Sequence, residues 1–447
     1  MFGSSGGRGR GGRNSGRGGR GGGRGGNYPK PRLQACSAYT MKGECKFGDS
    51  CRFAHVIRNH AQIELPTQQQ QQQQHNNQNG YRQNNYNQNR RSAVSDVSIW
   101  ETQGQIKIFV GSHDGYWRLY NTSGFTMEFE NRMGDGNGQV QCLEIASNYL
   151  FCGFEGISTM LPTVKVGMIH AWNLNSPSDP PMEFHVNKFS PYAHSNAITC
   201  LITASGAVVS GSRDGTIRLW QFNQALQNGK GGFALTNTFY GHVREVTGLT
   251  IVNNSILWSC STDHSMRIWD LNSGECQHLI CKKTAPTPNN SMTPNSAPPN
   301  DPSNVGHDKA ITSILTFEHD IGKFVLSGSL DGTIKAWNGA TGECLASEDH
   351  NIGVVSMSLN TDPKGNPIVL IGLEDGQLMI RNILQIQGVA PFSLIVSLAK
   401  FYQTNNHDGA IQCIKSGPSN TFYTGGKDGR LLVWQITGDL GADHGKK

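Results

Sequence analysis

From residue 93 to residue 436, short stretches of the chain alternate apolar and polar residues, and each stretch is led by a tight turn that usually contains an acid. Alternation with period two predicts a half-buried β-strand, and an Asp-Gly pair between two strands predicts a hairpin. The pattern therefore indicates a chain of hairpins. Seven such units recur, at 112–120, 154–172, 212–220, 261–270, 329–337, 373–381 and 426–434.

Further apolar strands precede several of these units. The acids of successive turns lie 41, 59, 49, 68, 44 and 53 residues apart. The shortest spacing is that of a four-stranded propeller blade, and the excess elsewhere predicts loop insertions. We therefore expect a mainly β fold, a seven-bladed propeller over 93–436, followed by a disordered tail over 437–447. The preceding strands are Ala197–Thr203, Val246–Val252, Ala310–Phe317 and Ala410–Lys415.

Closure of the ring needs an outer strand from outside the seven units. Either residues around 82–91 supply it, or one blade has only three strands. Two insertions, 157–166 and 282–306, lengthen connections that we expect to emerge on one face.

The units resemble the WD40 family. The Ser-Thr-Asp263-His-Ser-Met-Arg-Ile-Trp269-Asp270 stretch carries this resemblance most clearly, and a histidine precedes the first strand in five units. The resemblance implies a buried network of His, Asp, Trp and a strand hydroxyl, which in the fourth unit is Ser259 or Ser261. Because the set repeats in unit after unit, we interpret it as structural and not as a catalytic triad. The residues are His194, Asp214, Trp220, His242, Asp263, Trp269, His307, Asp331, Trp337, His407, Asp428 and Trp434, and the fifth histidine is His350.

Three units depart from this pattern. Tyr120 and Arg381 replace the Trp in the first and sixth units. The first and second units lack the histidine and have Arg90 and Gly136 in its place. We therefore expect these blades to lack the full network.

Ahead of the repeats, residues 31–58 carry three cysteines and a histidine at the spacing Cys-x8-Cys-x5-Cys-x3-His. Three thiolates and one imidazole complete a tetrahedral shell for one structural Zn²⁺, with no position open for catalysis. A segment of this size folds only if metal binding supplies the free energy. The ligands are Cys36, Cys45, Cys51 and His55.

This segment resembles the CCCH zinc-finger family, whose members bind short single-stranded RNA. The resemblance implies that Phe47 and Phe53 stack between bases. Their neighbours Lys46 and Arg52 favour the same role, because aromatic faces beside cations suit bases on a phosphate chain. The alternative is that both phenylalanines only form the small apolar core of the finger.

The N-terminal part of the chain is basic, whereas the repeat region is slightly acidic. Residues 1–100 carry 15 Lys and Arg against 4 Asp and Glu, whereas residues 101–447 carry 23 against 29. Polyanions should therefore be drawn to the N-terminal part. Residues 1–30 are an Arg/Gly-rich tail that we expect to be disordered, resembling the RGG segments of RNA-binding proteins, and residues 59–92 are a flexible Gln/Asn-rich linker. The tail arginines are Arg8, Arg10, Arg13, Arg17, Arg20 and Arg24.

The chain shows neither a secretory leader nor an apolar run long enough to cross a membrane. We therefore expect an intracellular protein without membrane association, with the nucleus favoured over the cytoplasm by the RGG and CCCH resemblance. The eight cysteines outside the finger should be reduced thiols that serve as small core residues.

The pairing of one CCCH finger with WD40 repeats resembles the zinc-finger/WD-repeat proteins of plants. We expect a non-enzymatic adaptor whose finger and tail bind single-stranded RNA and whose propeller docks protein partners, with no small-molecule substrate. The alternative is a substrate receptor or scaffold of a ubiquitin ligase or other complex, with a purely structural finger. Such receptors often carry Arg three positions after the strand Trp. The corresponding residues here are Asn175, Asn223, Asn272, Ala340 and Thr437.

Overall fold

A computed structural model gives the architecture of most of the repeat region. The residues that the structure describes are 42, 45, 46, 57–67, 91–133, 138–157, 163–187, 189–226, 231–282, 306–319, 322–383, 394–398 and 407–437.

Twenty-eight strands in these residues form seven four-stranded antiparallel sheets, which are the blades. Blade 1 contains β2 (Val94–Thr102), β3 (Gln105–Ser112), β4 (Tyr116–Asn121) and β5 (Met127–Arg132). Blade 2 contains β6 (Gln139–Ala146), β7 (Tyr149–Ile157), β8 (Lys165–Asn173) and β9 (Met182–Glu183). Blade 3 contains β10 (Ile198–Ala204), β11 (Ala207–Ser212), β12 (Ile217–Asn223) and β13 (Gly232–Phe239). Blade 4 contains β14 (Val246–Val252), β15 (Ile256–Ser261), β16 (Met266–Asp270) and β17 (Cys276–Ile280).

The remaining blades follow the same order. Blade 5 contains β18 (Ile311–His319), β19 (Gly322–Ser329), β20 (Thr333–Asn338) and β21 (Cys344–Asp349). Blade 6 contains β22 (Val354–Thr361), β23 (Pro367–Leu373), β24 (Leu378–Asn382) and β25 (Leu394–Leu398). Blade 7 contains β26 (Ile411–Ser416), β27 (Thr421–Gly426), β28 (Arg430–Ile436) and, from the other end of the chain, β1 (Ile57–Glu64).

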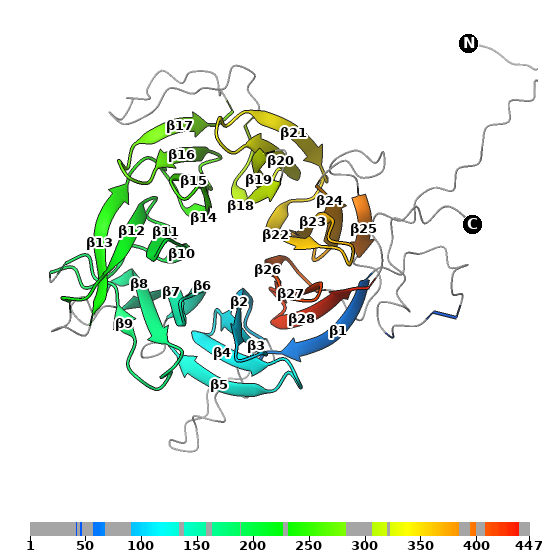
Figure 1. Cartoon of the computed structure of the whole chain (residues 1–447), viewed down its shortest axis with the longest axis horizontal. Helices are drawn as coiled ribbons and strands as arrows, with labels where there is room; N and C mark the ends of the chain where they lie inside the picture. The colour runs from blue at the N-terminus through cyan, green and yellow to red at the C-terminus, as the bar shows by residue number, and fades with distance from the viewer. Residues whose placement is uncertain are drawn as a thin grey trace, which may run out of the picture. The chain divides into compact units, whose positions relative to one another are not determined.

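The first strand of each blade lines the centre of the ring (Figure 1). Each of these strands contacts the first strand of the next blade, and β26 of blade 7 contacts β2 of blade 1, so the ring is closed. The predicted seven-bladed propeller is confirmed, and the four expected preceding strands appear as β10, β14, β18 and β26.

The closing strand is not the one expected from the sequence. Figure 1 shows β1, in blue, at the outer edge of blade 7 beside β28, in red, and the register runs from Ile57 opposite Ile436 to Glu64 opposite Arg430. Both expectations for closure were therefore wrong, because blade 7 has four strands and residues 82–91 do not supply the fourth. The predicted boundary between finger and linker at 58/59 also falls inside β1.

Strand β1 has the mixture of apolar and polar residues that is typical of a half-buried outer strand. Ile57, Ile63 and the adjacent Leu65 are buried, with exposed fractions of 0%, 6% and 1%. At the far end, an ion pair between Arg91 and Glu64 and an isolated bridge between Thr67 and Arg91 join the two sides of the connection to blade 1. The Gln/Asn-rich residues 68–90 lie outside the described residues.

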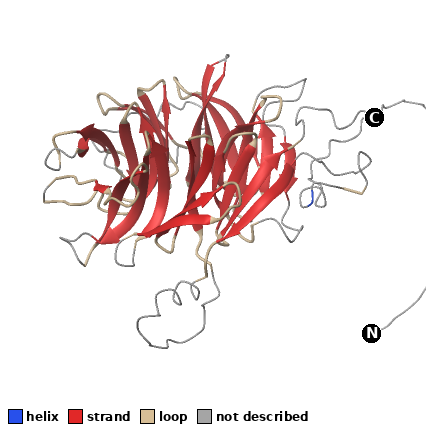
Figure 2. Ribbon diagram, turned by 60° about the horizontal axis from the view of Figure 1, so that its bottom comes forward, coloured by secondary structure: helices blue, strands red, loops and turns tan. Residues whose placement is uncertain are grey.

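Because successive strands of a blade run in opposite directions, their turns and connections gather on two opposite faces of the ring (Figure 2). We define the Asp face as the face that carries the connections between blades and the turn between the second and third strands of each blade. These turns include Asp114, Asp214, Asp263, Asp331 and Asp428. The opposite face carries the other two turns of each blade. The strand ends that flank the two predicted insertions, β7 to β8 and β17 to β18, lie on the Asp face, whereas residues 158–162 and 283–305 lie outside the described residues.

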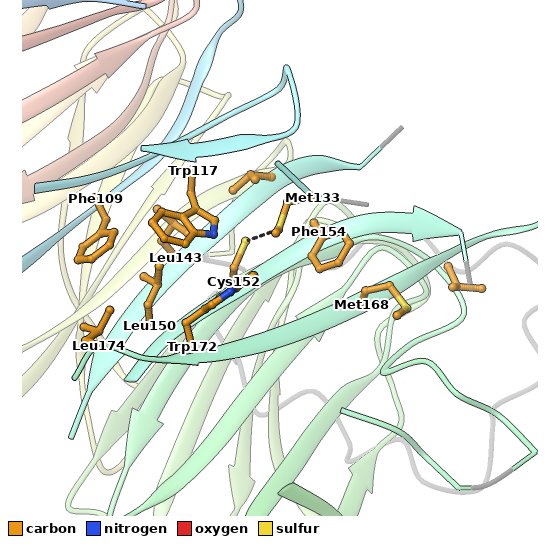
Figure 3. Packing of buried hydrophobic residues seen from close by; sticks show 12 residues of the cluster. Phe109, Trp117, Met133, Leu143, Leu150, Cys152, Phe154, Met168, Trp172 and Leu174 are labelled. Atoms are coloured by element: carbon orange, nitrogen blue, oxygen red, sulfur yellow. Dashed lines mark hydrogen bonds between the residues drawn. The ribbon is translucent and has the colours of Figure 1, made fainter. Parts of the chain in front are cut away.

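The core consists of apolar clusters between neighbouring blades. Figure 3 shows Trp117 of blade 1 packed against Trp172 of blade 2, with ring centroids 5.5 Å apart, and Cys152 beside Met133. Burial raises the pKa of Cys152 and Cys200 far above the usual cysteine value and that of Cys260 to about 12. These protonated thiols pack in or against the apolar clusters, as predicted from the sequence.

Within the residues that the structure describes, no helix is both long enough and apolar enough to span a bilayer.

Candidate functional site

Four blades carry the complete predicted network, and blade 4 shows its geometry. His242 Nδ1 lies 2.9 Å from Asp263 Oδ2, and His242 Nε2 lies 2.7 Å from Ser259 Oγ. Trp269 Nε1 donates to the same hydroxyl at 2.8 Å. The hydroxyl is therefore Ser259 and not Ser261, which resolves the alternative left open by the sequence.

Blades 3, 5 and 7 repeat this arrangement. His194, His307 and His407 place Nδ1 3.2, 3.1 and 3.0 Å from Asp214, Asp331 and Asp428. The bridging hydroxyls accept from the indoles at 2.8–2.9 Å. These hydroxyls belong to Ser210, Ser327 and Thr424, which accept from Trp220, Trp337 and Trp434 in turn.

Donor and acceptor chemistry fixes the direction of each network. The indole can only donate and the carboxylate can only accept, so the hydroxyl must donate to Nε2 and Nδ1–H must donate to Asp. Burial lowers the pKa of His194, His242 and His307 below the usual histidine value, and the nearby carboxylates raise it only in part. These three imidazoles are therefore neutral at physiological pH.

The carboxylates are held in the ionised form. Burial by itself raises the pKa of Asp263, but hydrogen bonds from His242 and Ser265 hold that pKa well below the usual aspartate range. The bridging Ser259 is fully buried and accepts the indole N–H. A buried hydroxyl in that role cannot reach a substrate, so the interpretation of the network as structural agrees with its geometry.

The departures predicted for blades 1 and 6 are confirmed, and in both an arginine replaces part of the network. Arg118 in blade 1 is fully buried, with Nη2 2.9 Å from Asp114 Oδ2 and Nε 3.2 Å from Glu130 Oε2. In blade 6, Arg381 Nη2 lies 3.2 Å from His350 Nδ1. Sequence reasoning missed Arg118, because units 3, 4 and 5 carry a cation at the same position after the turn acid, namely Arg218, Arg267 and Lys335.

Blade 2 has neither the histidine nor the aspartate of the network. Its turn acid Glu155 pairs with Lys165 at 3.2 Å, while Trp172 lies in the apolar cluster between blades 1 and 2. Apolar packing between blades thus takes the place of the polar network here.

Hydroxyl side chains join the first strands of neighbouring blades, a feature that sequence reasoning also missed. Thr199 donates to the carbonyl of Val246, and Thr247 to that of Ile311. Each of these threonines follows the first apolar residue of its strand, which is the signal that could have found them. The same link is made by Ser98 to Leu143, Thr312 to Val354 and Ser356 to Ile411.

On the opposite face, a cavity of about 490 Å³ lies where the first strands of blades 1, 2 and 7 end. Trp100 and Ile145 line its apolar side and Lys415 lines its polar side. Lys415 Nζ lies 3.8 Å from Glu144, whose pKa is raised by burial. The cavity is thus a half-apolar depression with a balanced charge.

Most predicted finger and tail residues lie outside the described residues. These are Cys36, Cys51, His55, Phe47, Phe53, Arg52 and the tail arginines Arg8 to Arg24. The structure describes two of the predicted site residues of the finger, of which Cys45 is half-buried and Lys46 is exposed. Three thiols and one imidazole are the donor set of a closed Zn²⁺ site. The described residues alone contain no cluster of acids, cysteines and histidines that could hold a metal.

The position of β1 in the chain shows how the finger segment is connected to the propeller. Strand β1 begins at Ile57, two residues after the last predicted zinc ligand, His55. The finger is therefore attached directly to the closing strand of the propeller and not through the Gln/Asn-rich segment, which follows that strand.

Comparisons with known families match both parts of the chain. The family "Zinc finger C-x8-C-x5-C-x3-H type (and similar)" matches residues 31–57. The family "WD domain, G-beta repeat" matches residues 301–338 and 399–435, and the family "IP5P C-F beta-propeller" matches residues 183–283. The match to the finger family implies zinc binding.

Among similar proteins, "Zinc finger CCCH domain-containing protein 17" of Oryza sativa subsp. japonica is 24% identical over 397 residues, which cover 89% of this chain and 72% of that protein. "Zinc finger CCCH domain-containing protein 62" of Arabidopsis thaliana is 25% identical over 206 residues, or 46% and 40% of the two chains. "F-box/WD repeat-containing protein sel-10" of Caenorhabditis elegans is 31% identical over 131 residues, which cover 29% of this chain and 17% of that protein. With the finger spacing and the closed ring, these matches show that the chain is a CCCH zinc-finger and WD40-repeat protein, homologous to plant zinc finger CCCH domain-containing proteins 17 and 62.

Proposed function

We propose that this protein is a non-enzymatic adaptor that binds single-stranded RNA through its finger and Arg/Gly-rich tail and docks protein partners on its propeller. The observation that carries the proposal is the direct attachment of a Cys3His finger to the closing strand of a complete propeller. An RNA-binding element and a large protein scaffold are thereby held together without a long linker.

Charge supports this division of roles. The Arg side chains of the tail are spaced by glycines with no acid among them, and the repeat region carries more acids than bases. Arginine can pair with phosphates and stack on bases, so the tail adds affinity to a finger that stacks only two bases.

The buried histidines support the non-enzymatic part of the proposal. In blades 3, 4, 5 and 7, the histidine, aspartate and hydroxyl are each satisfied by one another, and every histidine of these sets is at most 7% exposed. Groups that resemble a catalytic set are thus fully used in holding the blades together.

The test is RNA capture by the full chain and by a Cys51→Ser variant, with RNA crosslinked in cells and quantified per molecule of protein. Loss of one thiolate should release Zn²⁺ and unfold the finger, and captured RNA should fall by about tenfold or more. A Cys344→Ser variant, which changes a half-buried thiol of the propeller, is the matched control. Equal capture by wild type and Cys51→Ser would reject the finger as the RNA-binding element and favour the alternative of a scaffold with a structural finger.

A further inference from the structure

The three most exposed large apolar side chains of the described residues lie in the two connections that flank blade 3 in sequence. They are Val243, Phe189 and Tyr240, with exposed fractions of 82%, 76% and 62%. Tyr240 and Val243 belong to the connection from blade 3 to blade 4, which emerges on the Asp face. Phe189 lies in the turn 187–190 of the connection from blade 2 to blade 3, beside the bridge between His185 and Ala234 of β13 at the outer edge of blade 3. Exposed aromatic and aliphatic side chains at one place are typical of protein interaction sites.

The turn Arg213–Thr216 of blade 3 lies between the two connections that carry these side chains. On one side, Asp214 accepts hydrogen bonds from the Ser195 amide and hydroxyl. On the other side, a Cβ at Gly215 would lie 2.8 Å from the carbonyl oxygen of His242. The connections and the turn therefore form one continuous surface. We call it the blade-3 patch and define it by Arg213, Tyr240, Val243 and Arg244.

The patch is positively charged although the repeat region as a whole is negative. Arg213 and Arg244 are both exposed, and the half-buried Glu245 lies 3.6 Å from Arg213. The side chain of Asp263, which accepts from the Val243 amide, is buried and paired with His242. The turn aspartate Asp214 adds little negative surface, because its side chain is 9% exposed and bonds to His194.

The positive charge extends around the mouth of the ring. Lys309 and Lys427 are exposed on the Asp face of blades 5 and 7. Burial lowers the pKa of His113 in blade 1, Asp114 raises it, and Arg213 and Lys427 lower it further. Asp408, an acid of the same face, is paired, since it lies 3.3 Å from Arg430.

We propose that the blade-3 patch docks an acidic segment of a protein partner that carries aromatic or aliphatic anchors. The anchors would pack on Tyr240 and Val243, and the acids would pair with Arg213 and Arg244. An RNA ligand fits less well, because Val243, the most exposed of the apolar residues, offers no face for base stacking. This inference rests on the protein-docking half of the proposed function and names the partner chemistry for it.

The test uses the full-length protein and a variant with Val243→Glu and Arg244→Glu. The backbone amide of Val243, which donates to Asp263, remains in this variant. Random 12-residue peptides displayed on phage are selected on the wild type, and the recovered peptides are synthesised for fluorescence anisotropy. The matched control carries Leu345→Glu and Lys323→Glu, which change one exposed apolar and one cationic residue of blade 5.

We expect selected peptides rich in Asp and Glu around an aromatic or aliphatic residue. They should bind the variant about tenfold or more weakly, bind the control within about twofold of wild type, and weaken as salt rises from about 50 to about 300 mM. Acidic peptides that bind the variant with wild-type affinity, or selected peptides that are neutral or basic, would overturn the inference while leaving protein docking intact.

Two more results would also overturn the inference, each in a recognisable way. If a 12-residue oligouridine loses affinity for the variant as much as the peptides do, the patch is a nucleic-acid surface and the inference is wrong. If no peptide is retained on the wild type, the protein-docking half of the proposed function fails together with the inference.

Discussion

Replacement of Ser259 by Ala removes the hydroxyl that joins Trp269 to His242 in blade 4. This hydroxyl accepts from Trp269 Nε1 at 2.8 Å and lies 2.7 Å from His242 Nε2. Both rings are buried, with exposed fractions of 1% and 7%, so water cannot replace the lost partner without moving them.

The expected destabilisation follows from these two orphaned groups. Leaving one buried polar group without a partner costs about 1–3 kcal/mol. Two orphaned nitrogens therefore predict a loss of about 2–6 kcal/mol in the free energy of unfolding, a large part of the ~5–15 kcal/mol typical of a folded domain.

The assay is urea unfolding of the full chain, followed by tryptophan fluorescence, with Ser273→Ala in the same blade as the control. Ser273 is exposed in a turn, and its replacement should change the free energy of unfolding by less than about 0.5 kcal/mol. If Ser259→Ala matched that control, the reasoning that the network stabilises the blade through satisfied polar groups would be refuted.

Three other predictions concern charge and ring closure. The free energy of unfolding should fall as the pH drops from 7 towards 5. The buried histidines of blades 3 to 5 have a lowered pKa and stay neutral, so near pH 6.5 only the unfolded chain takes up protons on them. A urea midpoint that did not change over this pH range would contradict this prediction. Arg118→Ala should destabilise the chain by about 3–5 kcal/mol, since Asp114 would remain buried without its cation, whereas a loss below about 1 kcal/mol would show that the pair is dispensable. Ile63→Asp should open the ring by expelling β1 from blade 7, which limited proteolysis would reveal as faster release of residues 1–67; unchanged cleavage would argue against closure by β1.

The number of blades and the four networks could be predicted because each depends on local pattern. The turn aspartate and the strand tryptophan recur at nearly fixed spacing, and the histidine precedes the first strand at a fixed distance from its first apolar residue. Arg118 is harder to predict because its burial depends on two acids, Asp114 and Glu130, that strands β4 and β5 bring together.

The closing strand could not be recognised for a different reason. An outer strand buries only one side, so Ile57–Glu64 contains Asn59, His60 and Gln62 among its few apolar residues, and a bulge between Asn59 and Ala61 interrupts the alternation. Its partner β28 lies more than 360 residues away in sequence. Nothing local distinguishes such a segment from the end of the finger.

The central claim is that the zinc finger binds RNA while the propeller binds protein partners. Its most direct test is the affinity of the full chain for a short single-stranded RNA, compared between wild type, Phe47→Ala with Phe53→Ala, and the control Phe189→Ala on the propeller. Because each stacked base contributes about 1–3 kcal/mol, we predict that the double variant binds at least about thirtyfold more weakly, with zinc content and unfolding midpoint unchanged, and that the control binds like wild type. Wild-type affinity in the double variant, or an equal loss in Phe189→Ala, would contradict the account.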